Sequence, residues 1–245
     1  MTNEVGTRHN GEVTAEVGTW RDSTRIFLQP IAAPSILGLF GFAGATFMVA
    51  AHQAEWFGNT QSPAFLFPFA AMFGGLAQFL AGMWAYRARD AVATAAHGTW
   101  GAFWLGYGIL NLLAATGDIT LPTGDKFVEL GYWFIALAAI TFAGTMAALA
   151  ENVALTGVLG TLTIGSVLAA IWFGLGTSGF DKAAGWAFIV SAALAYYVAS
   201  AMLLETTYKR VVLPVGHRGE MDRPGRPIHQ LIQFEHGEPG IKIGQ

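Results

Sequence analysis

The stretch Pro34-Ser-Ile-Leu-Gly-Leu-Phe-Gly-Phe-Ala-Gly44 opens a long run without charged residues. Its proline stands where a helix would begin, and a proline in a first turn loses no helical hydrogen bond because that N–H has no intrahelical partner. On such a helix Gly38, Gly41 and Gly44 form a ridge without side chains, which another backbone or a passing molecule can approach closely. Phe42 projects its ring from a different part of the same helix. The stretch predicts either a helix-packing surface or one wall of a narrow pathway with Phe42 as its constriction.

Charged residues are scarce along the whole chain and leave six long gaps. They make up 12% of the 245 residues, about half of the share of about 25% that soluble domains carry. The gaps cover residues 26–54, 56–86, 91–117, 130–150, 152–180 and 183–204. Each gap is longer than the roughly 20 residues that a membrane-spanning helix needs. A soluble helical core would need charged outer faces, so the sequence predicts an all-α integral membrane protein with six transmembrane helices.

The predicted helices divide the chain into three parts. We expect helices over about 33–51, 64–86, 94–115, 127–150, 153–175 and 184–204. They form a transmembrane domain over 33–216, between a flexible N-terminal tail (1–32) and a flexible C-terminal tail (217–245). The first 25 residues are polar and mixed in charge, unlike a cleavable signal peptide, so the first membrane helix is expected to direct insertion.

The distribution of positive charge predicts the orientation in the membrane. Lysine and arginine accumulate on the cytoplasmic side of membrane proteins. Of the 13 lysines and arginines, only Lys126 and Lys182 fall in loops on the side opposite the two tails. Both termini are therefore predicted to be cytoplasmic, in a multi-pass protein of the cell (plasma or inner) membrane.

Composition and motifs argue against several kinds of chemistry. The absence of cysteine excludes disulfides, thiolate catalysis and cysteine-ligated metals. No basic cluster suggests nucleic acid, and neither a His-Glu-x-x-His motif nor a phosphate-binding glycine loop followed by lysine occurs. The predicted helix centres contain no Asp, Glu, Lys or Arg for acid–base work. We therefore predict a passage for a small solute, with no enzymatic activity, no metal and no cofactor.

A few polar side chains lie within the predicted helices. Gln78 stands between two glycines, where its amide either hydrogen-bonds a neighbouring helix or contacts a substrate. The hydroxyls of Thr99 and Thr163 either bond their own preceding helical turn or flank a pathway. His52 and His97 lie near predicted helix ends, and we expect both to face headgroups or water.

The third predicted helix carries an aromatic face. Trp100, Phe103, Trp104 and Tyr107 recur at the spacing of one side of a helix. This face either packs or touches lipid, or it meets Phe42 across a pore, and periodicity does not choose between these arrangements.

Three sequence motifs occur in order along the chain. They are Ser35-Ile-Leu-Gly-Leu-Phe-Gly-Phe42, then Phe73-Gly-Gly-Leu-Ala-Gln-Phe-Leu-Ala-Gly-Met-Trp84 followed by Gly101-Ala-Phe-Trp104, and finally Leu213-Pro-Val-Gly216. Together they resemble the acetate uptake transporters, also called succinate–acetate permeases, over about residues 32–216. The resemblance implies a six-helix protomer that assembles as a homohexamer. Each protomer would then hold its own pathway for acetate and similar small monocarboxylates, and in some members for succinate, as a proton-coupled permease or an anion channel.

The resemblance also implies a hydrophobic constriction made of one Phe, one Tyr and one Leu. These positions fall on Phe42, Trp100 and Leu162, so tryptophan, which is bulkier and offers N–H in place of O–H, replaces the tyrosine. The family signature Asn-Pro-Ala-Pro-Leu-Gly reads Ala33-Pro-Ser-Ile-Leu-Gly38 here, without the asparagine and the second proline. Ser35 offers a replacement hydroxyl. The candidate substrate contacts are Ser35, Leu37, Gly38, Gln78, Thr99, Phe103 and Thr163.

The expected function is a membrane transporter or channel for acetate and related small monocarboxylates, including succinate as a candidate, with proton linkage. The expected partners are the carboxylate solute, the lipid bilayer and further copies of the chain, and no nucleic acid. Two alternatives stay open. One is a channel for a small neutral solute such as urea, whose flux would ignore proton gradients. The other is a membrane sensor that transports nothing and signals through its tails.

Overall fold

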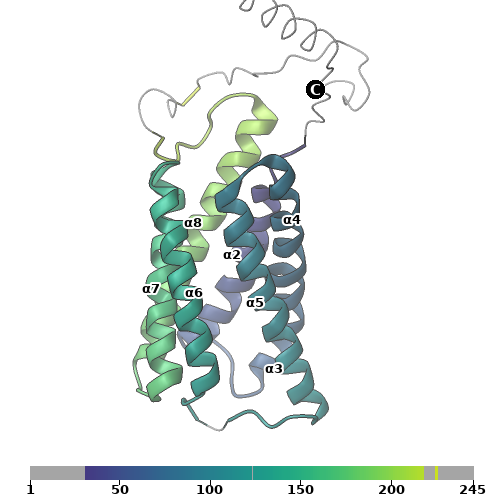
Figure 1. Cartoon of the computed structure of the whole chain (residues 1–245), viewed down its shortest axis with the longest axis vertical. Coiled ribbons are helices and arrows are strands. Elements are labelled where there is room, and N and C mark those ends of the chain that lie inside the picture. Colours follow the sequence, from purple (N-terminus) through teal and green to yellow (C-terminus); the bar gives the residue numbers. More distant parts are fainter. Residues whose placement is uncertain (1–30, 123, 218–223, 226–245) are drawn as a thin grey trace, which may run out of the picture. The chain divides into compact units, whose positions relative to one another are not determined.

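The computed structural model describes residues 31–122, 124–217, 224 and 225, and the helices among them belong to one compact unit, Ala33–Leu231. These described residues form helices and no strand. The helices are α2 (Pro34–Gln53), α3 (Ser62–Ala70), the π-helical segment η1 (Ala71–Ala77), α4 (Gln78–Ala88), α5 (Ala91–Thr116), α6 (Val128–Ala148), α7 (Val153–Leu175) and α8 (Phe180–Tyr208). Figure 1 shows them running side by side. The predicted tails, 1–32 and 217–245, lie almost entirely outside the described residues.

Five helices in the described part of the chain are long and apolar enough to cross a membrane. They are Pro34–Gln53, Ser62–Ala88 (α3, η1 and α4 together), Val128–Ala148, Val153–Leu175 and Phe180–Tyr208. The chain is therefore a multi-pass membrane protein. α5 has 26 residues but is not among the five, since polar residues such as His97 and Asn111 make it less apolar. The sixth span and the side of the termini stay predictions.

Local chemistry fixes where α5 and α7 begin and end. The Asp90 carboxylate accepts the backbone N–H three residues on, at 2.8 Å, and so caps the first turn of α5. The amide oxygen of Asn152 does the same for α7, also at 2.8 Å. Gly117 and Gly176 follow the two helices with φ of 84° and 67°. A glycine adopts this left-handed conformation without the steric strain that a Cβ introduces.

The second predicted helix, 64–86, differs most from a regular α-helix. It begins at Ser62 and ends at Ala88, and its middle is the π-helical η1. Pro68 lies inside α3 and has no N–H to donate to the preceding turn. The loss of one helical hydrogen bond so close to η1 offers a physical reason for the irregular stretch. The other predicted helices are present within four residues of their expected ends, and α7 has its predicted bounds.

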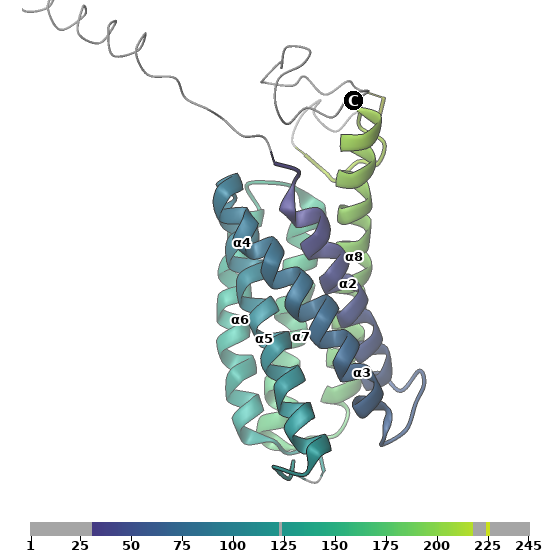
Figure 2. The same cartoon turned by 90° about the vertical axis from the view of Figure 1, so that its right-hand side faces the viewer.

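Glycines bring the helices close together around the site. In the bundle α2 packs against α8 and η1, α4 packs against α5, and α6 and α8 both pack against α7 (Figure 2). A Cβ at Gly41 would collide with the carbonyl oxygen of Phe73 in η1. A Cβ at Gly74 would lie 2.7 Å from the indole of Trp104 in α5. The ridge on α2 is therefore a packing surface for part of its length.

Candidate functional site

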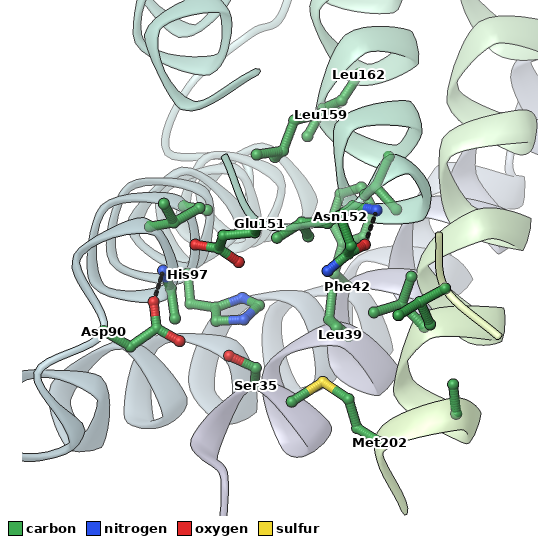
Figure 3. Close-up of a pocket in the computed structure, with 18 of the residues that line it drawn as sticks. Ser35, Leu39, Phe42, Asp90, His97, Glu151, Asn152, Leu159, Leu162 and Met202 are labelled. Atoms are coloured by element: carbon green, nitrogen blue, oxygen red, sulfur yellow. Dashed lines mark hydrogen bonds between the residues drawn. The ribbon is translucent and has the colours of Figure 1, made fainter. Parts of the chain in front are cut away.

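A cavity of about 280 Å³ lies at one end of the bundle, and we call it the vestibule (Figure 3). Its walls come from the first turns of α2, α5 and α7 and the last turns of α8, together with residues that follow α8. Most of the lining is apolar, including Leu39, Val92, Leu155, Leu159, Val198 and Met202. The vestibule therefore lies at the end of the bundle at which α2 begins and α8 ends.

Phe42, Trp100 and Leu162 form the inner end of the vestibule, and we call these three residues the neck. Each is the lining residue deepest along its own helix, on α2, α5 and α7. Their exposed fractions are only 2%, 3% and 2%. The rings of Phe42 and Trp100 meet edge to face with centroids 6.4 Å apart. The aromatic face of α5 thus points into the protein and meets Phe42.

The indole of Trp100 is held in the neck by a hydrogen bond. Its Nε1–H donates to the Oγ1 of Thr141 on α6 at 2.9 Å, and both residues are buried. Since an unpaired N–H is costly in an apolar interior, this bond makes tryptophan compatible with the position. Figure 1 shows α6 beside α5, which places the acceptor there.

Three buried polar side chains line the vestibule between the neck and the opening: Ser35, Gln78 and His97. The Nε2 of Gln78 lies 3.5 Å from the Nδ1 of His97, so the amide links α4 to α5. His97 does not face the headgroups as one of its predicted alternatives had it, because its exposed fraction is 4%, and it lines the vestibule instead. α5 begins three residues earlier than predicted, at Ala91. His97 consequently lies in the second turn of the helix, on its inner side.

Carboxylates surround the opening of the vestibule. Asp90, Glu151 and Glu205 contribute to its lining, together with His217. Partial burial, followed by the nearby charge of Asp90, raises the pKa of Glu151, while His217 acts in the opposite direction. The sequence did contain a signal for this group. All three carboxylates stand at ends of predicted helices on the side of the tails, but only the fold shows that they share one opening.

The segment after α8 folds back over the start of α7 and gives the Leu213-Pro-Val-Gly216 motif a structural role. The backbone N–H of Ala154 donates to the carbonyl of Val215 at 2.9 Å, and that of Val153 donates to the carbonyl of Gly216 at 3.2 Å. The hydroxyl of Tyr197 donates to the carbonyl of Pro214 at 2.6 Å. These bonds hold Val215 and His217 at the rim of the vestibule.

The remaining sequence-predicted site residues lie outside the vestibule lining. Leu37 is 51% exposed. Thr99 donates to the carbonyl of Ala95 and lines a separate shallow groove between α4 and α5. Phe103 packs against the rings of Trp100 and Phe134. The hydroxyl of Thr163 donates to the carbonyl of Leu159 in its own helix. Gly38 lies against the ring of His97. The structure therefore brings together Ser35, Phe42, Gln78, Trp100 and Leu162 from the predicted set.

Comparisons with known proteins agree with the sequence motifs. The "Succinate-acetate/proton symporter SatP" of Escherichia coli (strain K12) is 28% identical over 187 residues, which cover 76% of this chain and 96% of that protein. The "Acetate transporter protein patA" of Aspergillus clavatus is 27% identical over 193 residues, 73% of this chain and 75% of that protein.

A solved structure shows the same arrangement of helices. The structure of the bacterial acetate channel SatP superposes with a TM-score of 0.70 at 27% sequence identity, and the match covers 76% of this chain and all of that one. Residues 19–217 match the GPR1/FUN34/yaaH family. Since this match spans most of the sequence and includes every helix described above, the chain belongs to the GPR1/FUN34/yaaH family.

Proposed function

We propose that this protein carries acetate and related short monocarboxylates across a membrane, through the vestibule and the neck of each protomer. The observation that carries the proposal is the position of Phe42, Trp100 and Leu162. The family resemblance implies that these residues form a constriction, and they line the inner end of one cavity. The relatives named as acetate transporters and the acetate channel structure support the choice of solute.

The apolar neck makes the charge of the solute important. A carboxylic acid with a pKa near that of glutamic acid, about 4.3, is almost entirely ionised at pH 7. An anion pays a large desolvation penalty in an apolar constriction. Proton linkage would reduce this penalty, because the undissociated acid is neutral. We therefore include proton-linked movement in the proposal, in keeping with the relative that is named a symporter.

The remaining parts of the proposal concern topology and assembly. In it α5 also spans the membrane and brings the number of transmembrane helices to six. Both termini are cytoplasmic, and the vestibule is open to the cytoplasm of a cell whose plasma or inner membrane holds the protein. The functional particle is a homohexamer with one pathway in each protomer. The asymmetry of lysine and arginine supports the orientation, and the family resemblance supports the assembly.

Uptake into proteoliposomes tests the function directly. The purified full-length protein is reconstituted, and labelled acetate is added with and without an inward proton gradient. We expect saturable uptake that unlabelled acetate inhibits and that the gradient accelerates. Uptake no faster than in empty liposomes, from protein that is folded and oligomeric, would contradict the proposal. Inhibition by urea and not by carboxylates would favour the neutral-solute alternative.

Trp100→Ala tests the neck itself. Replacing the indole by a methyl group removes the bulkiest side chain of the constriction and should widen it. We expect faster acetate flux and uptake of larger monocarboxylates that the unmodified protein excludes. The measurement is the initial uptake rate for a series of acids of increasing chain length. The same uptake rate and the same size cut-off as in the unmodified protein would show that Trp100 does not restrict the passage of the solute.

A further inference from the structure

We propose that His97, positioned by Gln78 and Gly38, is the carboxyl-binding residue of the vestibule, and that it makes the site selective for short monocarboxylates over dicarboxylates. The inference rests on the proposed function and assigns a solute contact and a substrate preference to the same site. The position of His97 in the vestibule emerges only from the fold (Figure 3).

His97 offers a hydrogen-bond donor in an apolar setting. Past the carboxylates of the opening, the walls of the vestibule are mostly aliphatic, with Ser35, Gln78 and His97 as buried polar side chains. When the amide nitrogen of Gln78 donates to Nδ1 at 3.5 Å, the neutral imidazole carries its proton on Nε2. The Nε2–H is then available to a carboxyl oxygen. Figure 3 shows the imidazole projecting into the cavity.

The orientation of the imidazole is fixed from two sides. A Cβ at Gly38 would lie 2.6 Å from both Cε1 and Nε2 of the ring, so the ring rests where only a glycine leaves room. Gln78 approaches the other ring nitrogen from α4. The Oε1 of Gln78 is buried and has no hydrogen-bond partner in the described part of the chain. An undissociated carboxylic acid supplies both an acceptor and an O–H donor, which suits this pair of side chains.

The neck lies one helical turn beyond His97. Trp100 follows it by three residues on α5, a rise of roughly 4.5 Å along the helix. A carboxyl group at His97 therefore directs the carbon chain of its solute towards Phe42, Trp100 and Leu162. A methyl group, or a short alkyl chain, fits against these apolar side chains. The arrangement of one donor followed by an apolar surface matches a short monocarboxylate.

A dicarboxylate fits the same arrangement poorly. With one carboxyl group at His97, its second group either points into the apolar neck and loses its hydration or points back to the opening. There it meets Asp90, Glu151 and Glu205, and like charges repel. Both placements are unfavourable, so the geometry disfavours succinate although a relative is named for it.

Competition and binding measurements on the full-length chain test this inference. We compare labelled-acetate uptake by the unmodified protein and by H97L, H97Q and H52L, with unlabelled acetate or succinate as competitor. H97L removes the donor, and H97Q keeps an N–H donor. H52L is the matched control, because His52 lies at the opposite end of α2 and bonds to the carbonyl of Phe57. Acetate binding to each purified protein is measured separately by calorimetry, and thermal unfolding monitors folding.

We expect half-inhibition of acetate uptake to need at least about tenfold more unlabelled succinate than unlabelled acetate. H97L should raise the half-saturating acetate concentration about tenfold, the size expected for one lost hydrogen bond to the solute. H97Q should recover part of this loss, and H52L should match the unmodified protein. Equal half-saturation in H97L and the unmodified protein would overturn the inference.

Equal competition by succinate and acetate in the unmodified protein would also overturn it, even if H97L does not fold. If the unmodified protein transports no acetate but binds it, and H97L does not bind it, the proposed function fails and the His97 site stands. If it neither transports nor binds acetate, both fail.

Discussion

Trp100 shows how one substitution in a constriction depends on a partner on another helix. The family resemblance implies tyrosine at this position, and an indole brings an N–H into an apolar interior. Thr141 supplies the acceptor at 2.9 Å, while its own hydroxyl donates to the carbonyl of Leu137 at 2.6 Å. The Thr141 hydroxyl therefore uses both its donor and its acceptor capacity, and it settles the orientation of the indole.

Replacing Thr141 by valine should destabilise the protein by about 1–2 kcal/mol, because it leaves the indole N–H buried and unpaired. Trp100→Phe removes the indole N–H, so Thr141→Val leaves no donor unpaired in that background. We therefore expect T141V to cost less stability in W100F than in the otherwise unmodified protein. Thermal unfolding in detergent of the four proteins in this cycle measures the coupling. Strictly additive effects would mean that the hydrogen bond contributes nothing.

Glu151 should make the entry of an anion depend on pH. Burial and Asp90 raise its pKa, so this carboxyl takes up a proton at a higher pH than an ordinary glutamic acid. At neutral pH the ionised form repels an anionic solute at the opening, and as the pH falls through the raised pKa the repulsion disappears. We expect acetate flux in E151Q to exceed that of the unmodified protein at neutral pH, with a ratio that approaches one at acidic pH.

Comparing the two proteins at each pH cancels the protonation of acetate itself, which is the same for both. The control is E129Q, because Glu129 is exposed at the opposite end of α6. Its flux ratio should stay at one throughout. A constant ratio for E151Q would show that Glu151 does not titrate in this range or does not influence the solute.

At the scale of elements, α2 is positioned by its contact with the irregular η1. The backbone of η1 approaches α2 so closely that no side chain fits at Gly41. This contact sets the distance between α2, which carries Ser35 and Phe42, and the helix that carries Gln78. The glycine ridge of α2 therefore holds the walls of the vestibule in place, and at Gly38 it also makes room for His97.

Gly41→Ala should destabilise the fold by about 1–3 kcal/mol, because its methyl group would overlap a backbone carbonyl that cannot rotate away. Gly106→Ala is the matched control on α5. A Cβ there meets nothing within 4 Å in the described residues, so the variant should be unchanged or up to about 1 kcal/mol more stable from its higher helix propensity. Thermal unfolding measures the stability of both variants, and equal stabilities would contradict close packing at Gly41.

At the scale of the whole molecule, the vestibule lies at the end of the bundle where α2, α5 and α7 begin and α8 ends. The proposed orientation makes this end cytoplasmic. The loop between α5 and α6, which lies at the other end of both helices, would then face outward. Since the chain has no cysteine, single cysteines report the two sides without background.

Thr120→Cys and Thr207→Cys form a matched pair, because both threonines are exposed and they lie at opposite ends of the bundle. A membrane-impermeant maleimide added to intact cells should label T120C and leave T207C unlabelled until the membrane is permeabilised. The reverse pattern would invert the proposed orientation. Labelling of both from outside would contradict the three spans α6, α7 and α8 that separate the two positions.

The sequence alone predicted most of the helices, since charge-free runs leave few alternatives in a bilayer. It was less successful where a helix is irregular or begins early. Pro68 removes one helical hydrogen bond but does not specify that a π-helical segment follows, and α5, capped by Asp90, begins three residues before its predicted start. That small shift decided the environment of His97. For the site, the neck residues came from family motifs, while the carboxylates of the opening were visible only as separate helix ends.

Patterning and composition determined by themselves that this chain is helical, apolar enough for a membrane and without cysteine chemistry. These properties depend on each residue and its close neighbours in sequence, so they are readable without a fold. Only the tertiary structure decided that Phe42, Trp100 and Leu162 close one cavity, that Thr141 accepts the indole N–H, and that His97 lies beside Gly38 and Gln78. The physical reason is that each of these contacts joins side chains from different helices, and helix periodicity gives the face of a residue without specifying which helix will pack against it.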